Sequence, residues 1–167
     1  MQLFSQAVPV WSVAGNESSD QYRVFRKKFA VSEVPQQVWI DIAADTTFCV
    51  WINGTRLPIQ QLADFPGDIT VSRYDISSLL VPGENIIACE VHFVGENFST
   101  CFAGTAFLCA EVKSINSVLA ATDSSWKCAV SPDMVSGLAC KVSLQLGFVF
   151  CKDARRSVPY HRLDFDD

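Results

Sequence analysis

The stretch QVWIDIAADTTFCVWING, residues 37–54, decides the fold class. Its apolar side chains recur at every second position, which is typical of β-strands that bury one face. The buried faces are predicted to carry Val38, Ile40 and Ile42 in the first half, and Phe48, Val50 and Ile52 in the second. Asn53-Gly54 then supplies the residue pair that a tight hairpin turn favours. The stretch therefore predicts two strands followed by a hairpin turn.

Further strands are expected on the C-terminal side of this hairpin. The candidates are rich in β-branched and aromatic residues: 86–94, 103–112, 140–146 and 148–151. Helical signals are weak. Asp75 could cap a short turn within residues 74–80, and Ser131 could cap another within residues 130–137. No linker rich in Gly, Ser or Pro divides the 167 residues, so the pattern predicts one all-β sandwich or barrel domain over residues 1–167.

Composition and charge exclude several classes of protein. Hydrophobic residues make up 49% and charged residues 19% of the chain, which excludes a disordered protein. The net charge of −5 disfavours binding to phosphate backbones, and we interpret Arg26-Lys27-Lys28 as a solvated strand face. No run approaches the roughly 20 apolar residues that span a membrane. Neither nucleic acid nor a membrane is therefore expected as a partner.

The seven cysteines point to a reducing compartment. Their number is odd, they form no CxxC pair, and most lie in apolar runs, so we interpret them as reduced core side chains. Reduced thiols favour the cytoplasm. The N-terminus lacks the charged and apolar regions of a signal peptide, but an export signal could have been removed. Localisation therefore stays open at this point.

Several motifs occur in one order along the chain. They are Val10-Trp11 with FRKKF at 25–29, FCVWINGTR at 48–56, YDISSLL at 74–80 with PGENII at 82–87, TDSSWK at 122–127, DAR at 153–155 and FDD at 165–167. In order and rough spacing they resemble the N-terminal β-sandwich domains of bacterial α-L-rhamnosidases. Lys152, which stands where that family often has an aromatic residue, and cysteines at several strand positions depart from the pattern.

This resemblance implies a jelly-roll β-sandwich of the galactose-binding-domain-like type. It also implies a non-catalytic accessory domain of a glycoside hydrolase, packed against the catalytic domain of the same polypeptide. On that interpretation, residues 156–167 lead into a further domain. The motifs themselves are folding motifs, so the resemblance bears on function by association.

The sequence offers no constellation for catalysis. Glycoside hydrolysis needs two positioned carboxylates, which the resemblance assigns to a separate helical barrel domain. Asp41 and Glu90 alternate with apolar neighbours in predicted strands, so we expect both to face outward and to be solvated. His92 is likewise expected on an exposed strand face. No catalytic residue is therefore predicted in this chain.

Carbohydrate binding is the main functional alternative, as in an autonomous binding module for rhamnose-type sugars. Sugars bind to aromatic platforms flanked by polar loop residues, and the candidates are Trp11, Glu17, Asp45, Trp51 and Asn97. Trp51 lies opposite the predicted core face, so it is a platform if solvent covers it and structural if protein does. We favour the structural role. Exposed aromatics at a loop rim would indicate sugar binding, whereas a broad apolar patch would indicate docking.

No cofactor and no metal are predicted. Strand alternation places Cys89 and His92 on opposite faces, which argues against a zinc site or a Cys–His pair. A structural calcium is the alternative that stays open. The loop DFPGD at residues 64–68 could offer oxygen ligands, although it lacks the signature of a calcium-binding loop.

Overall fold

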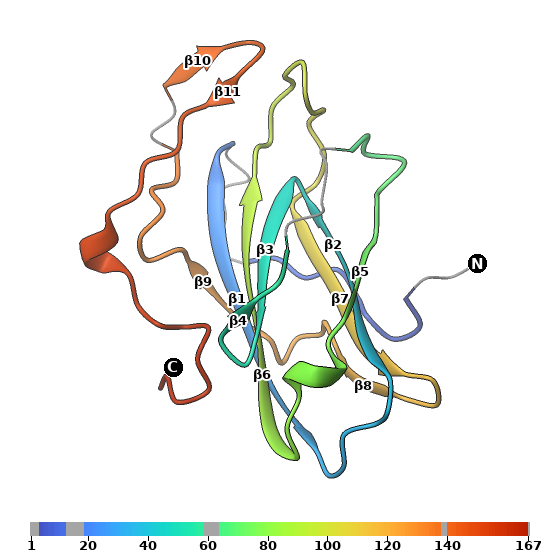
Figure 1. Cartoon of the computed structure of the whole chain (residues 1–167). Helices are drawn as coiled ribbons and strands as arrows, with labels where there is room; N and C mark the ends of the chain where they lie inside the picture. Colours follow the sequence, from blue (N-terminus) through green and yellow to red (C-terminus); the bar gives the residue numbers. More distant parts are fainter. Residues whose placement is uncertain (1–3, 13–18, 59–63, 138–139, 167) are drawn as a thin grey trace.

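The alternating stretch forms strands β2 (Val38–Asp45) and β3 (Thr47–Ile52), as predicted. The computed structural model describes residues 4–12, 19–58, 64–137 and 140–166 (Figure 1). The strands that pair around β2 and β3 are β1 (Gln21–Val31), β4 (Thr55–Arg56), β5 (Ser72–Asp75), β6 (Gly83–Phe93), β7 (Phe107–Ser114), β8 (Val118–Ala121) and β9 (Lys127–Val130). One antiparallel sheet has the order β4-β3-β6-β1-β9, and the other has the order β5-β2-β7-β8. The predicted all-β jelly-roll sandwich is confirmed.

The Asn53-Gly54 turn forms where the sequence predicted it. Ile52 pairs with Thr55 across the hairpin, and both turn residues have positive φ, 49° at Asn53 and 84° at Gly54. The Asn53 amide also donates to the carbonyl oxygen of Leu79 and to Oδ1 of Asn85, each at 2.8 Å. Side-chain hydrogen bonds therefore fix this turn to the 3-10 turn at Ser77–Leu79 and to the start of β6.

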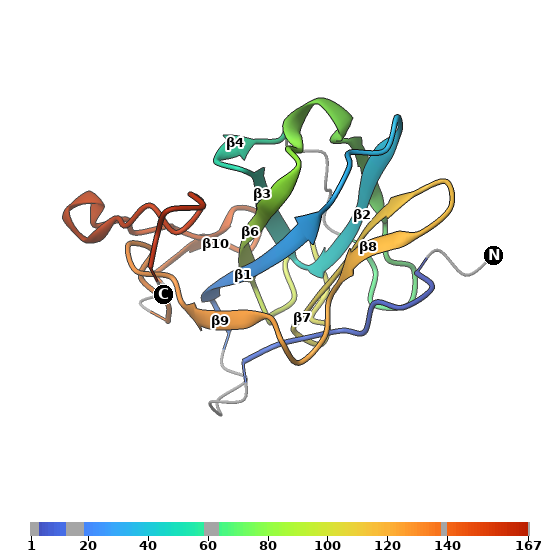
Figure 2. The same ribbon diagram turned by 90° about the horizontal axis from the view of Figure 1, so that it is seen from below.

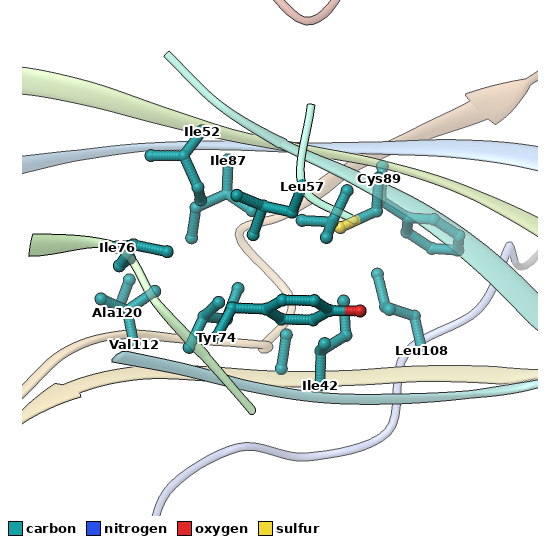
Figure 3. Packing of buried hydrophobic residues seen from close by; sticks show 14 of the residues in the cluster. Ile42, Ile52, Leu57, Tyr74, Ile76, Ile87, Cys89, Leu108, Val112 and Ala120 are labelled. Carbon is teal, nitrogen blue, oxygen red and sulfur yellow. The ribbon is translucent and has the colours of Figure 1, made fainter. Parts of the chain in front are cut away.

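The core lies between the two sheets. Figure 3 shows Ile52 and Ile87 of the five-stranded sheet on one side, and Ile42 and Leu108 of the four-stranded sheet on the other. The six inward positions predicted in β2 and β3 are each at most 4% exposed. Burying such an aliphatic or aromatic side chain stabilises the fold by roughly 1.5–3 kcal/mol. The period-two pattern therefore identified the central residues of the core.

A segment near the N-terminus binds the four-stranded sheet. The Glu111 carboxylate in β7 accepts hydrogen bonds from the backbone N–H groups of Ser5, Gln6 and Ala7, at 2.7–3.1 Å. Further along, Val10 forms an isolated antiparallel bridge with Leu108. Figure 2 shows this dark blue segment running past β7 and β8. A buried carboxylate thus holds the segment in place.

The outer face of the five-stranded sheet is covered by a C-terminal segment, residues 131–137 and 140–166, which we call the strap. Arg26 in β1 donates to the carbonyl oxygens of Tyr160, Arg162 and Phe165 at 2.7, 2.8 and 3.0 Å. The strap also contains the small hairpin of β10 (Lys141–Ser143) and β11 (Gly147–Phe148). Figures 1 and 2 show the strap beside β9 and β1, away from the four-stranded sheet.

Some local predictions are wrong. Residues 130–137 form no helical turn, because β9 occupies 127–130 and irregular backbone follows it. Residues 74–80 divide into the end of β5 and a 3-10 turn, Ser77–Leu79, where Asp75 does accept a hydrogen bond from the N–H of Ser77. No helix in the described residues is long and apolar enough to cross a membrane.

The cysteines are all free thiols, but they do not share one environment. Cys89, Cys101 and Cys109 are buried, as expected for core side chains, and Cys49 is half-buried. The prediction fails for three others, because Cys128, Cys140 and Cys151 are exposed. Cys128 lies in β9 at the end of the five-stranded sheet, and the other two lie in the strap.

Candidate functional site

The predicted carbohydrate-binding residues do not converge on one place. Trp11 packs on the core, with its ring centre 5.6 Å from that of Phe25. Trp51 contacts the ring of Tyr160 in the strap at 5.9 Å, which agrees with a structural role. Asn97 is exposed and uses its side-chain oxygen to accept a hydrogen bond from the N–H of Ala103. Glu17 lies outside the described residues.

Asp45 lies at the rim of the sandwich, at the base of a hollow of about 420 Å³. Its carboxylate accepts a hydrogen bond from the Thr46 hydroxyl at 2.9 Å. Oδ2 of the same carboxylate lies so close to Gly104 that a Cβ atom there would be 1.8 Å away. Burial, with a smaller contribution from the charge of Asp64, raises the pKa of Asp45. The rim therefore holds a shielded carboxylate.

Two rim loops also expose an aromatic pair that sequence reasoning missed. Phe65 and Phe102 are 64% and 51% exposed, and their ring centres are 5.0 Å apart. They come from the loop before β5 and the loop between β6 and β7. Neither residue lies in a pattern that indicates contact with the other, so no local signal could have paired them.

A second hollow, of about 510 Å³, lies on the outer face of the five-stranded sheet beneath the strap. We call it the outer-face pocket. The strap contributes apolar side chains, and the sheet contributes polar ones together with Phe48. The full lining is Tyr22, Thr47, Phe48, Cys49, Arg56, Glu90, His92, Met134 and Phe150. The Phe150 ring is 74% exposed at this site. Aromatic and polar groups therefore share one concave surface.

Glu90 and His92 line the outer-face pocket. Their side chains were predicted to be exposed to solvent, and the structure shields both of them. Both are half-buried, and the His92 side chain is 21% exposed. Burial raises the pKa of Glu90, although hydrogen bonds from Ser131 and Tyr160 oppose this change. Burial lowers the pKa of His92, although its Nε2 lies 3.0 Å from the Asp20 carboxylate. The expectation was wrong because the strap covers this sheet face.

Asp41, on the four-stranded sheet, was also predicted to be solvated, and this prediction is wrong too. It is 1% exposed, and its carboxylate lies 2.6 Å from Nε of Arg73 and 2.9 Å from Nζ of Lys113. Burial alone would raise the pKa of Asp41, but the hydrogen bonds from these two cations lower it. Asp41 is therefore a buried carboxylate whose charge is balanced by two cations, one of them, Arg73, half-exposed.

The loop at residues 64–68, which could offer oxygen ligands to calcium, already uses one of its carboxylates for hydrogen bonds within the protein. Asp64 accepts hydrogen bonds from the N–H and the hydroxyl of Thr70, at 2.6 and 2.9 Å. Within residues 4–12, 19–58, 64–137 and 140–166, no group of three or more His, Cys, Asp or Glu side chains could hold a metal ion.

The protein is a β-sandwich domain, because two antiparallel sheets pack face to face. It has a hollow at a loop rim and another on the outer face of a sheet. No protein-family model and no curated protein matches the chain. Several solved structures do match it. The GH78 rhamnosidase of Bacillus sp. GL1 is 29% identical with a TM-score of 0.85, and the match covers 98% of this chain but 17% of that enzyme.

Other solved structures share the fold. The α-L-rhamnosidase of Dictyoglumus thermophilum is 22% identical with a TM-score of 0.70, covering 88% of this chain and 17% of that one. A Pleurotus ostreatus lectin in complex with GalNAc is 20% identical with a TM-score of 0.52, covering 76% of this chain and 37% of the lectin. The resemblance to a rhamnosidase domain is confirmed, and the chain spans about 17% of the length of these two rhamnosidases.

Proposed function

We propose that this chain is a non-catalytic accessory domain of an α-L-rhamnosidase-like glycoside hydrolase, packed against the catalytic domain of the same polypeptide. One observation carries the proposal: nearly the whole chain superimposes on a domain-sized part of the Bacillus sp. GL1 rhamnosidase, at 29% identity. The match covers 98% of this chain and a small share of the enzyme, as expected for one domain among several.

The exposed apolar side chains of the strap support a docking role. Val142, Leu144 and Leu146 are 56–72% exposed, and all lie within the β10–β11 hairpin. Contiguous exposed apolar surface on a soluble domain is typical of an interface. The hairpin is held against the loop between β6 and β7 by the ring contact of Phe98 with Phe148 and by a hydrogen bond from the N–H of Ser99 to the carbonyl oxygen of Leu144 at 3.1 Å. We assign the contact with the catalytic domain to this hairpin.

The test is a chimera in which this chain replaces the matching segment of the Bacillus sp. GL1 rhamnosidase. We expect a folded enzyme that hydrolyses an aryl α-L-rhamnoside, whereas the chain alone shows no turnover. Changing both Leu144 and Leu146 to serine should lower the melting temperature of the chimera but not that of the isolated chain. Ile115→Ser is the matched control, because Ile115 is 74% exposed on a distant loop. Turnover by the chain alone would contradict the proposal.

Carbohydrate contact is a second candidate function. It is favoured by exposed aromatic rings at two places, Phe65 and Phe102 in the rim loops and Phe150 in the outer-face pocket beside Glu90. Calorimetric titration with L-rhamnose and rhamnose-containing oligosaccharides tests this function directly. The titration should be run with and without calcium, because the 64–68 loop contains two aspartates. Saturable binding supports a carbohydrate-binding role, and no heat at millimolar sugar opposes it.

A further inference from the structure

We propose that the outer-face pocket, rather than the rim, is the place at which this domain binds a neutral pyranose sugar. The inference rests on the second function proposed above and assigns a site to it. A pyranose ring has an apolar C–H face and a rim of hydroxyl groups that both donate and accept hydrogen bonds. A site for it must therefore place an aromatic or apolar wall beside donors and acceptors in one hollow.

The outer-face pocket meets this requirement. Phe150 and Met134 of the strap form an apolar wall, and the sheet contributes polar groups of different kinds. Arg56 is a pure donor, the Glu90 carboxyl group offers acceptor oxygens, and the Thr47 hydroxyl can act as either donor or acceptor. The volume of about 510 Å³ lies within the range of roughly 300–1,000 Å³ that is usual for small-molecule sites.

The polar side of the pocket is held in place before any ligand enters. The His92 ring stacks on Tyr22 with centres 4.0 Å apart, and its Nε2 lies 3.0 Å from the Asp20 carboxylate. The Arg56 guanidinium donates to Sγ of Cys49 at 2.9 Å and lies over the Trp51 ring. Side chains that are already fixed lose little conformational entropy on binding.

The charges around the pocket favour an uncharged ligand. Arg56 is the cation in its lining, and the Glu90 carboxylate lies in the same lining. Asp20 stands behind His92, and Asp133 lies near Glu90 but is already paired with Lys152 at 3.1 Å. An acidic sugar would therefore meet carboxylates as well as the guanidinium. A neutral ring avoids that repulsion.

The rim lacks this combination. The hollow beside Asp45 is lined by Pro66, Ile69, Ala103, Gly104, Thr105 and Phe107, and the exposed pair Phe65 and Phe102 is not part of its lining. Asp45 and Thr105 are its polar side chains. The carboxylate and the aromatic surface of the rim therefore do not face one bound ring. The rim pair instead provides a matched control for the experiment.

The experiment is a titration of the whole chain with methyl α-L-rhamnoside, methyl β-D-galactoside and glucuronate, followed by calorimetry and by ¹³C-methyl NMR of methionine. The chain contains two methionines, so the Met134 signal is readily assigned against Met1. We expect a neutral glycoside to shift the Met134 signal. Phe150→Ala and Arg56→Ala, both at exposed positions, should each weaken binding about tenfold or more, whereas Phe65→Ala should not.

Each alternative outcome has a defined meaning. Undiminished binding in Phe150→Ala and Arg56→Ala, with loss in Phe65→Ala, would place the sugar at the rim and overturn the site assignment while leaving carbohydrate binding intact. Tighter binding of glucuronate than of either neutral glycoside would overturn the preference for an uncharged ring. No binding of any sugar at millimolar concentration would overturn both carbohydrate proposals, and the accessory-domain proposal would stand on its chimera.

Discussion

Replacing Glu111 with glutamine should destabilise the domain by about 3 kcal/mol near neutral pH, and the loss should disappear in acid. Glu111 is fully buried, and its carboxylate accepts hydrogen bonds from three successive backbone N–H groups, those of Ser5, Gln6 and Ala7. Lys113 adds an ion pair at 3.0 Å. Glutamine keeps the shape of the side chain but removes the negative charge that these donors face.

The magnitude follows from the pKa of the carboxyl group. Burial alone would raise the pKa of Glu111, but the hydrogen bonds from the N-terminal backbone and from Lys113 lower it from 4.5 to about 2. Each pKa unit corresponds to about 1.4 kcal/mol, which gives about 3 kcal/mol. Because folding lowers this pKa, the stabilisation is complete above the unfolded-state value near 4.5 and is lost as the pH falls toward about 2.

The assay is urea unfolding of the wild type and of Glu111→Gln at several pH values between about 7 and about 3. The difference in unfolding free energy should be largest at the upper end and should shrink steadily below about pH 4.5. Glu84→Gln is the matched control, because Glu84 is exposed and lies 3.9 Å from Lys28. A difference that stays constant over the whole range would refute the electrostatic reasoning.

Three further changes test other features of the fold. Gly104→Ala should lower the free energy of unfolding by about 1–3 kcal/mol, measured by calorimetry, because the added Cβ would clash with Oδ2 of Asp45. Gly67→Ala is the control and should be near neutral, because there is open space around Gly67. Arg26→Met should release the strap and raise its rate of proteolysis roughly tenfold or more, since even one charged hydrogen bond is worth about 1.5 kcal/mol. Asn85→Ala should cost about 2–4 kcal/mol in urea unfolding, because this buried amide donates to two carbonyl oxygens and accepts from two N–H groups.

Alternation in the sequence predicted which side chains face the core, and it could not predict what covers the outer faces. Ile40 and Val50 lie in the core as expected, because a strand places every second residue on one side. Asp41 and Glu90 also lie on the predicted outer sides. They are nevertheless shielded, because cations from other strands pair with Asp41 and the strap covers Glu90.

The candidate site could be predicted only in part, because the sequence pattern does not show which segments cover the outer faces of the sheets. Asp45 was singled out because it lies at a turn, and the structure does place it beside a hollow at the rim. The outer-face pocket joins Arg56 and Glu90 of the sheet to Phe150 of the strap, which are far apart in the sequence. Such a site depends on how the strap crosses the sheet, and no local periodicity encodes that path.

The contact between Arg26 and the strap has a consequence for how this chain can diverge. Its guanidinium binds main-chain oxygens at positions 160, 162 and 165, and every amino acid presents such an oxygen. Arg162 could therefore be replaced by many residues without loss of the attachment, whereas a replacement of Arg26 removes all three of these hydrogen bonds at once. Sequence drift in the strap can reshape the wall of the outer-face pocket while its course over the sheet is preserved.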